Sequence, residues 1–182
     1  IKPPFQLAEG TSADQLAQQS QELCGTLRPL SLEGLELSRL GSLLALTVTG
    51  DTRPLAELAS TAVTSLDHFR APPSDAELAK RRRANLSERQ EAYLTQWGYP
   101  YVLEDFRFHL TLTGRLEKAR AVAIPDALEP AIANPLPKQF TIPHLTLAGE
   151  DHEARFPRTQ RLPIEPQQEK RGKNATRKGL LS

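Results

Sequence analysis

The chain of 182 residues is 25% charged and 38% hydrophobic, with a formal net charge of +1. Its length suffices for one domain or two closely packed lobes, and its balanced charge excludes a general electrostatic attraction to nucleic acid or acidic membranes. No stretch approaches the roughly eighteen apolar residues of a membrane-spanning helix. Cys24 is the only cysteine, which excludes an internal disulfide and favours a reducing, cytoplasmic location.

The charge is unevenly distributed along the chain. Residues 165–182 carry five Lys or Arg and two Asp or Glu, which, subtracted from totals of 23 and 22, leaves 18 basic and 20 acidic residues elsewhere. This end also lacks apolar periodicity. We therefore expect residues 1–164 to fold and residues 165–182 to form a basic, disordered tail.

Capping and alternation signals predict the first elements. Ser12 and Gln15 have the spacing of a capping box, which predicts the start of a helix. Residues 35–39 and 42–49 are predicted to be two neighbouring strands. Pro54 begins an amphipathic helix that runs to about residue 69.

The second half of the chain is predicted in the same way. Ser74 and Ser87 mark two further helix starts, and Gly98 ends the second helix. A strand follows at 106–113. The remaining predicted elements are a helix at 116–133 and strands near 139–147 and 154–164. Strands before and after helices, twice over, predict an α+β protein with two similar sheet-and-helix lobes.

The strand at 106–113 carries the strongest functional signal. It reads Phe-Arg-Phe-His-Leu-Thr-Leu-Thr, and a period of two separates an apolar face from a polar one. The apolar face is predicted to pack into the core, while Arg107, His109 and Thr111 project together into a cleft. A proton carrier beside hydroxyls and a guanidinium suits a phosphate ester. The alternative is a half-buried strand with a solvated polar face. The apolar residues are Phe106, Phe108, Leu110 and Leu112.

Residues 106–114 resemble the second His-x-Thr-x motif of the 2H phosphoesterase superfamily. The chain is also similar to the branch of that superfamily often encoded in phosphonate-utilisation operons. The resemblance covers about residues 1–164 and implies a bilobal fold with two His-x-Thr motifs facing each other across a cleft. One imidazole would act as general base and the other as general acid, while the threonine hydroxyls hold phosphoryl oxygens. The other matching segments are residues 1–5, 40–46, 69–72, 77–82 and 97–102.

The chain departs from the family pattern at its start. In the family a His-Ala-Thr run precedes Lys-Pro-Pro-Phe, and Ile1 to Phe5 match only the end of that stretch. The resemblance therefore implies that the first histidine and threonine lie upstream of Ile1. We expect the complete protein to be an enzyme and the printed chain alone to be nearly inactive.

The resemblance implies roles for several residues. His109 would be one member of the acid–base pair, and Thr111 would donate to a phosphoryl oxygen. Lys2, Arg107 and Tyr101 are candidate substrate contacts, against the alternatives of an exposed lysine, a surface ion pair and aromatic turn packing.

A second string, His144-Leu-Thr-Leu147, repeats the string at His109 and is the alternative partner motif. Pro143 weakens a central-strand assignment there. His144 and Thr146 are also predicted to share a face with the apolar Phe140 and Ile142, which favours a structural strand.

These observations lead to one functional hypothesis and two alternatives. The hypothesis is a cytoplasmic, monomeric, metal-independent cyclic phosphodiesterase without a cofactor. By resemblance, its substrate is a small phosphorylated sugar such as 5-phosphoribosyl 1,2-cyclic phosphate. The enzymatic alternative acts on a nucleoside 2′,3′-cyclic phosphate or an RNA end. The other alternative is a non-catalytic protein that binds a phosphosugar or an RNA end. No membrane partner is expected.

Overall fold

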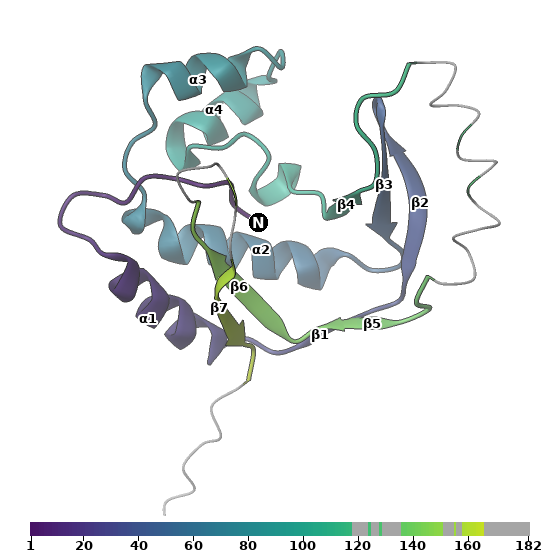
Figure 1. Cartoon of the computed structure of the whole chain (residues 1–182), viewed down its shortest axis with the longest axis horizontal. Coiled ribbons are helices and arrows are strands. Elements are labelled where there is room, and N and C mark those ends of the chain that lie inside the picture. Colours follow the sequence, from purple (N-terminus) through teal and green to yellow (C-terminus); the bar gives the residue numbers. More distant parts are fainter. Residues whose placement is uncertain (118–123, 125–127, 129–135, 151–154, 156–157, 166–182) are drawn as a thin grey trace, which may run out of the picture.

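The computed structural model describes residues 1–117, 124, 128, 136–150, 155 and 158–165, and it is an α+β protein as predicted (Figure 1). The helices are α1 (Ala13–Cys24), α2 (Arg53–Leu66), α3 (Asp75–Arg82) and α4 (Glu88–Trp97), with 3₁₀ turns η1 (Asp67–Phe69) and η2 (Leu103–Asp105). The strands are β1 (Leu30–Leu32), β2 (Leu35–Leu40), β3 (Leu43–Val48), β4 (His109–Thr111), β5 (Phe140–Ile142), β6 (His144–Ala148) and β7 (Arg158–Pro163). Most of the predicted helix at 116–133 and of the tail at 165–182 lies outside the described residues.

Local signals account for the starts of three helices. Ser12, Ser74 and Ser87 each accept a hydrogen bond from the backbone N–H three residues on, and the Gln or Glu there accepts the serine's own N–H. Gly98 ends α4 in the left-handed conformation, with a φ of 71°. The predicted capping boxes and the predicted end of α4 are therefore confirmed.

Gly98 also lies close to the side chain of Arg70. A Cβ atom on Gly98 would be 2.9 Å from Arg70 Nη1. Arg70 donates to both carboxylate oxygens of Asp67 at 3.0 and 3.1 Å, and to the carbonyls of Ala71 and Gln96 at 3.1 and 3.0 Å. Arg70 thus connects η1 to the C-terminal end of α4.

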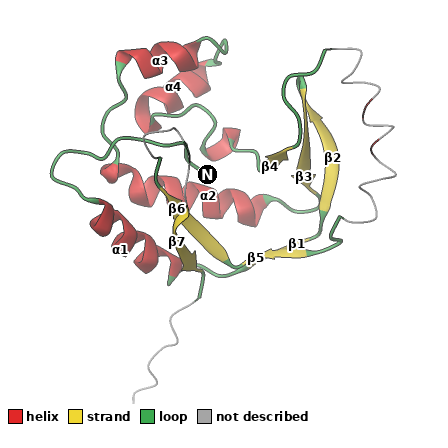
Figure 2. Ribbon diagram, viewed as in Figure 1, coloured by secondary structure: helices red, strands yellow, loops and turns green. Residues whose placement is uncertain are grey.

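The described strands form three antiparallel sheets, β2–β3–β4, β1–β5 and β6–β7 (Figure 2). The hairpin of β2 and β3 confirms the strands predicted at 35–39 and 42–49. The strand predicted near 139–147 is divided in two. Pro143, which has no N–H for a strand ladder, separates β5 from β6.

The strand predicted at 106–113 is shorter in the structure and packs differently. Regular pairing covers only His109–Thr111, because η2 precedes it and Leu103 has a positive φ of 52°. Leu110 and Leu112 are 45% and 46% exposed, so the prediction that this apolar face packs into the core is wrong for these two. The physical reason is that β4 is a three-residue edge strand paired only with β3 among the described strands.

A cluster of buried residues lies where the helices meet the sheet β6–β7. Helix α1 packs against α2, β6 and β7 (Figure 2). The cluster consists of Cys24, Leu58, Leu162 and Ile164, with Leu27, Leu30, Ile142, Leu145 and Leu147 packed against it. None of the described helices is long and apolar enough to cross a bilayer.

Candidate functional site

The register of the sheet β2–β3–β4 brings polar side chains from three strands onto one face. His109 lies opposite Thr47, and Thr47 lies opposite Glu36. Thr111 lies opposite Ala45, which lies opposite Ser38. Directly paired residues project from the same face of a sheet. We call this surface the polar face, and its polar members are Glu36, Ser38, Thr47, His109 and Thr111.

His109 is exposed at the edge of the polar face, and its ring has a defined hydrogen bond. Nδ1 lies 2.8 Å from the backbone carbonyl oxygen of Arg107. A carbonyl oxygen can only accept, so Nδ1 carries the proton in this arrangement. In the neutral ring Nε2 is then the unprotonated nitrogen, which is the form that a general base requires.

Three hydroxyl groups accompany His109. Thr111 follows it by two residues on the same strand, and its hydroxyl has no hydrogen-bond partner within the described part of the chain. Ser38 Oγ and Thr47 Oγ1 lie 2.6 Å apart and share a hydrogen bond. Sequence reasoning singled out Thr111 but missed Ser38 and Thr47. The alternation of the two hairpin strands predicts which face of each strand Ser38 and Thr47 occupy. Only the register with β4 shows that this face also carries His109.

Arg107 and Tyr101 lie on the segment that leads into β4. Arg107 is exposed, and its guanidinium makes no hydrogen bond to any described residue, while its carbonyl holds the His109 ring. Tyr101 is 38% exposed and packs edge-on against Tyr99, with ring centroids 5.5 Å apart. Their predicted roles as substrate contacts remain predictions.

The start of the segment that carries β4 is fixed by an ion pair. Arg89 of α4 donates to both carboxylate oxygens of Asp105, at 2.8 and 3.1 Å. These hydrogen bonds hold the pKa of Asp105 below its usual range. The last residue of η2 is therefore attached to α4.

Lys2 lies in a different setting. Its ammonium is paired with Asp67 and lies 5.7 Å from the centre of the Phe5 ring, and its side chain is only 13% exposed. Burial lowers the pKa of Lys2, and the hydrogen bond to Asp67 opposes that shift. Lys2 thus joins the N-terminal residues to the carboxylate that also binds Arg70. The structure shows no contact between Lys2 and His109, and the role predicted for Lys2 remains a prediction.

The second string, at His144, lies on a different sheet from His109. Leu145 and Leu147 of β6 pack on the buried cluster, so alternation places His144 and Thr146 on the face of β6 away from it. Ile142 also packs on that cluster. The prediction that His144 and Thr146 share a face with Ile142 is therefore wrong, because Pro143 interrupts the alternation.

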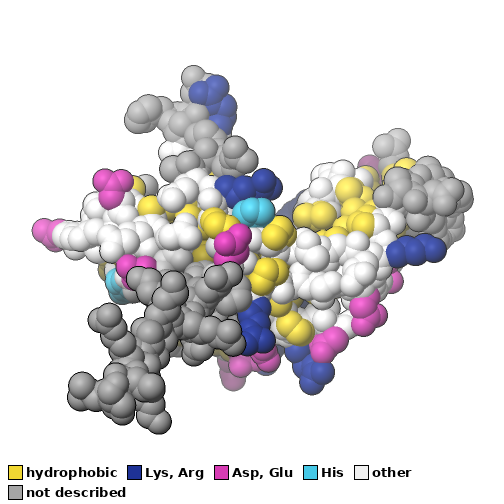
Figure 3. All heavy atoms as spheres, turned by 90° about the horizontal axis from the view of Figure 1, so that it is seen from below, with side chains coloured by type: hydrophobic (Ala, Val, Ile, Leu, Met, Phe, Trp, Pro, Cys, Tyr) yellow, Lys and Arg dark blue, Asp and Glu magenta, His cyan; other side chains and the backbone are white. Residues whose placement is uncertain are grey.

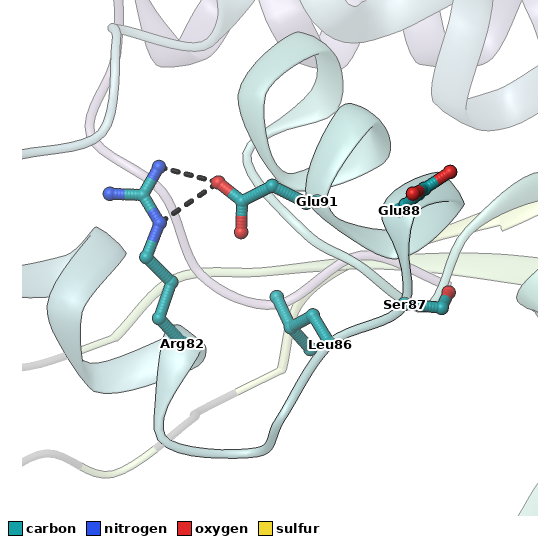
Figure 4. A pocket seen from close by; sticks show the side chains of 5 residues that line it. All are labelled: Arg82, Leu86, Ser87, Glu88 and Glu91. Atoms are coloured by element: carbon teal, nitrogen blue, oxygen red, sulfur yellow. Dashed lines mark hydrogen bonds and ion pairs between the residues drawn. The ribbon is translucent and has the colours of Figure 1, made fainter.

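A hollow of about 600 Å³ lies elsewhere, between α3 and α4 (Figure 4). The guanidinium of Arg82 lies within it and donates to Glu91 at 2.6 and 2.9 Å, while Ser87 caps α4. Arg82 and Glu91 are therefore engaged with each other, and Ser87 is engaged with Gln90 of α4. This hollow contains no histidine, and it is not the site that the sequence indicates.

Two further observations concern the ligands that the surface could hold. No group of three or more His, Cys, Asp or Glu that could hold a metal ion is found among the residues that the structure describes. On the face seen in Figure 3, acidic and basic side chains are interspersed rather than gathered by sign. That pattern gives this face no broad attraction to a polyanion.

Comparison with known proteins gives a family and two relatives. A family model described as "Protein of unknown function (DUF1045)" matches residues 1–157. The chain is similar to a protein of Janthinobacterium sp. (strain Marseille) named "Ribose 1,5-bisphosphate phosphokinase PhnN". The two are 39% identical over 175 residues, which cover 93% of this chain and 39% of the relative.

A protein of Laribacter hongkongensis (strain HLHK9) with the same name is 36% identical over 141 residues, covering 74% of this chain and 30% of that relative. The chain therefore spans well under half the length of these two relatives. No solved structure matches the chain.

Proposed function

Because this chain belongs to the DUF1045 family, whose function is unknown, we propose an activity from its polar face: hydrolysis of a cyclic phosphodiester on a phosphorylated sugar. His109 is the acid or base, and Thr111 donates to a phosphoryl oxygen. One observation carries the proposal: β4 presents an imidazole with a fixed tautomer beside hydroxyls that can donate to phosphoryl oxygens.

The relatives' name supports the substrate class. Ribose 1,5-bisphosphate is the compound in that name. Water attack on 5-phosphoribosyl 1,2-cyclic phosphate that breaks the bond from phosphorus to O2 yields ribose 1,5-bisphosphate. The compound in the relatives' name is therefore the product of the proposed reaction. As the resemblance implies, we place this reaction in phosphonate metabolism.

The phosphokinase step itself is not part of the proposal. The sequence contains no GxxxxGK[S/T] run, the glycine-rich loop with which P-loop enzymes hold the phosphates of ATP. The chain also spans 39% and 30% of the two relatives, whose name describes the whole protein. We therefore propose that this chain produces or binds the phosphosugar and does not transfer phosphate from a nucleotide.

The proposed reaction needs a second acid–base group. In an in-line displacement the attacking and leaving oxygens lie on opposite sides of phosphorus, so one imidazole cannot serve both. The resemblance assigns the second role to another His-x-Thr motif on a facing lobe. In this proposal the sheets β2–β3–β4 and β6–β7 belong to the two lobes of a 2H phosphoesterase fold.

The test uses the complete product of the gene and a panel of cyclic phosphates, assayed with EDTA present. The panel contains 5-phosphoribosyl 1,2-cyclic phosphate and the nucleoside 2′,3′-cyclic phosphates. We expect turnover that survives EDTA and falls by about 10²–10⁴-fold in His109→Ala, the usual contribution of a positioned acid or base. His144→Ala is the matched control, because it removes the other described His-x-Thr histidine, and it should retain turnover.

Other results would change the assignment. Equal loss of turnover in both variants would assign the partner role to His144. Turnover that EDTA abolishes would contradict a metal-independent mechanism.

A non-catalytic phosphosugar- or RNA-end-binding protein is the second candidate. It is favoured by one observation: the described residues bring a single histidine, His109, to the polar face. This candidate predicts binding of the phosphosugar without turnover in the complete gene product. Preference for an RNA end over the phosphosugar in the same binding assay would support its RNA version.

A further inference from the structure

We propose that Thr47 is a third binding group for the phosphoryl moiety at His109, and that Ser38 orients its hydroxyl. The inference rests on the proposed phosphoryl site and deepens it. His109 and Thr111 belong to one sequence motif, whereas Thr47 comes from β3 and Ser38 from β2. The register of three strands is what brings these residues together.

The spacing of a sheet suits a single phosphoryl group. Thr47 lies directly opposite His109, so their Cβ atoms are about 5 Å apart. Thr111 lies two residues beyond His109 on the same strand, about 7 Å away, and is the diagonal neighbour of Thr47. The three side chains form a triangle on one face. The two hydroxyls can donate toward a tetrahedral group above its centre, and His109 Nε2 can do so when the ring is protonated.

The hydrogen bond between Ser38 and Thr47 gives the hydroxyl of Thr47 a direction. When Ser38 donates to Thr47 Oγ1 across the 2.6 Å separation, the proton of Thr47 remains free to donate to a bound anion. A hydroxyl that already accepts a hydrogen bond is a stronger donor, because the bonds polarise one another. Thr47 is partly exposed.

Charged groups of both signs lie near this triangle. Glu36 lies directly opposite Thr47 on β2, so their Cβ atoms are also about 5 Å apart, and it is two strand spacings, about 10 Å, from His109. Arg107 is exposed two residues before His109, and its side chain makes no ion pair with a described residue. Asp105, two residues before Arg107, is paired with Arg89. The hydroxyls of Thr47 and Thr111 thus add neutral donors beside one imidazole.

The experiment measures phosphate binding at His109 directly. The complete gene product is labelled in its histidine rings, and inorganic phosphate is titrated while the His109 signals, identified by their loss in His109→Ala, are followed by NMR. We expect Thr47→Val to weaken phosphate binding about tenfold or more, the usual effect of losing a hydrogen bond to a charged group. Thr47→Ser should restore most of the affinity because it keeps the hydroxyl.

The controls separate a binding role from a structural one. Thr141→Val removes an exposed hydroxyl from β5, at a similar strand position outside the polar face, and should leave the affinity unchanged. Ser38→Ala should weaken binding in the wild-type background and have no further effect in Thr47→Val. That non-additivity is expected only if Ser38 acts through Thr47.

Several results would overturn the inference. One is wild-type phosphate affinity in Thr47→Val, and another is a lack of rescue in Thr47→Ser. A third is a set of His109 signals that do not respond to phosphate in the wild-type protein. The proposed function fails separately, by an absence of turnover on cyclic phosphates. A protein that binds phosphate through Thr47 without turnover would keep this inference and favour the binding candidate.

Discussion

The His109 ring is held by the backbone of its own strand rather than by a carboxylate. The carbonyl of Arg107 accepts from Nδ1, so the orientation of the ring follows the path of the chain between η2 and β4. A backbone acceptor fixes the tautomer without placing a negative charge beside the ring. The geometry of this histidine therefore depends on the segment that leads into β4.

Thr111 gives a prediction at the residue scale. Thr111→Val keeps the shape of a β-branched side chain and removes a hydroxyl that has no partner among the described residues. We expect kcat/KM for cyclic phosphate hydrolysis to fall about tenfold or more in the complete gene product. Thr111→Ser should recover most of this loss, and a Val variant with unchanged kcat/KM would remove Thr111 from the site.

At the scale of elements, the sheet β2–β3–β4 is buried unequally. Leu44 of β3 is fully buried, and its carbonyl oxygen accepts the backbone N–H of Leu112, which is 46% exposed. The central strand β3 therefore contributes buried side chains to the packing of this sheet, while the edge strand β4 is largely exposed and carries His109 and Thr111. Leu110 and Leu112 alternate as in a buried strand, but they remain exposed because β4 lies at the edge of the sheet.

The two leucines give a paired prediction. We expect Leu44→Ala to lower the free energy of unfolding by about 2–4 kcal/mol, because it leaves a cavity in a close-packed region. Leu112→Ala should lower it by less than about 1 kcal/mol, because much of that side chain is already in water. Urea unfolding of both variants measures the difference, and equal losses would mean that Leu112 is buried.

A cluster of charges holds the N-terminal residues against η1. Asp67 receives hydrogen bonds from Arg70 and Lys2, and the side chains of all three are at most 20% exposed. Burial raises the pKa of Asp67, but these hydrogen bonds outweigh it, so the pKa lies below its usual value. The backbone reinforces the attachment: Ala8 donates to the carbonyl of Phe69 at 2.9 Å.

This cluster predicts a pH-dependent loss of stability. Asp67→Asn should lower the free energy of unfolding by about 2 kcal/mol near neutral pH, because two partly buried cations lose their partner. The folded pKa is depressed, so the contribution of the carboxylate is present above the unfolded value of about 3.9 and is lost as the pH falls through the folded pKa. The difference in free energy of unfolding between the variant and the wild type should therefore begin to narrow below about pH 4 and disappear below the folded pKa.

The control for this prediction is Asp51→Asn. Asp51 pairs with Arg53, whose side chain is 84% exposed, and exposed pairs contribute little to stability. Urea unfolding at several pH values should show no measurable change in that variant. A similar effect of both substitutions would mean that burial does not strengthen the cluster around Asp67.

At the scale of the whole molecule, the starts of three of the described helices were predictable and the assembly of the sheets was not. Ser12, Ser74 and Ser87 cap helices through partners only three residues away, so the sequence itself contains both halves of each signal. Pairings such as Thr47 with His109 join residues far apart in the chain. Alternation gives the face of a residue within its strand but not the strand beside it.

The same limit applies to the candidate site. Its first members, His109 and Thr111, were predictable because they share one short motif. The register added Ser38 and Thr47, and it separated His144 onto another sheet. The predicted faces failed at Pro143 and at Leu110, where an interrupted strand and an exposed edge override a simple period of two.

The contact between Gly98 and Arg70 constrains how this sequence can vary. Any other residue at position 98 must adopt a left-handed backbone and also displace the Arg70 side chain, which connects η1 to the end of α4. A single exchange at Gly98 therefore disturbs two elements at once, whereas a shorter side chain in place of Arg70 would relieve the crowding but not the backbone. We therefore expect substitutions at these two positions to depend on each other, because a relative that keeps the arginine has a physical reason to keep the glycine.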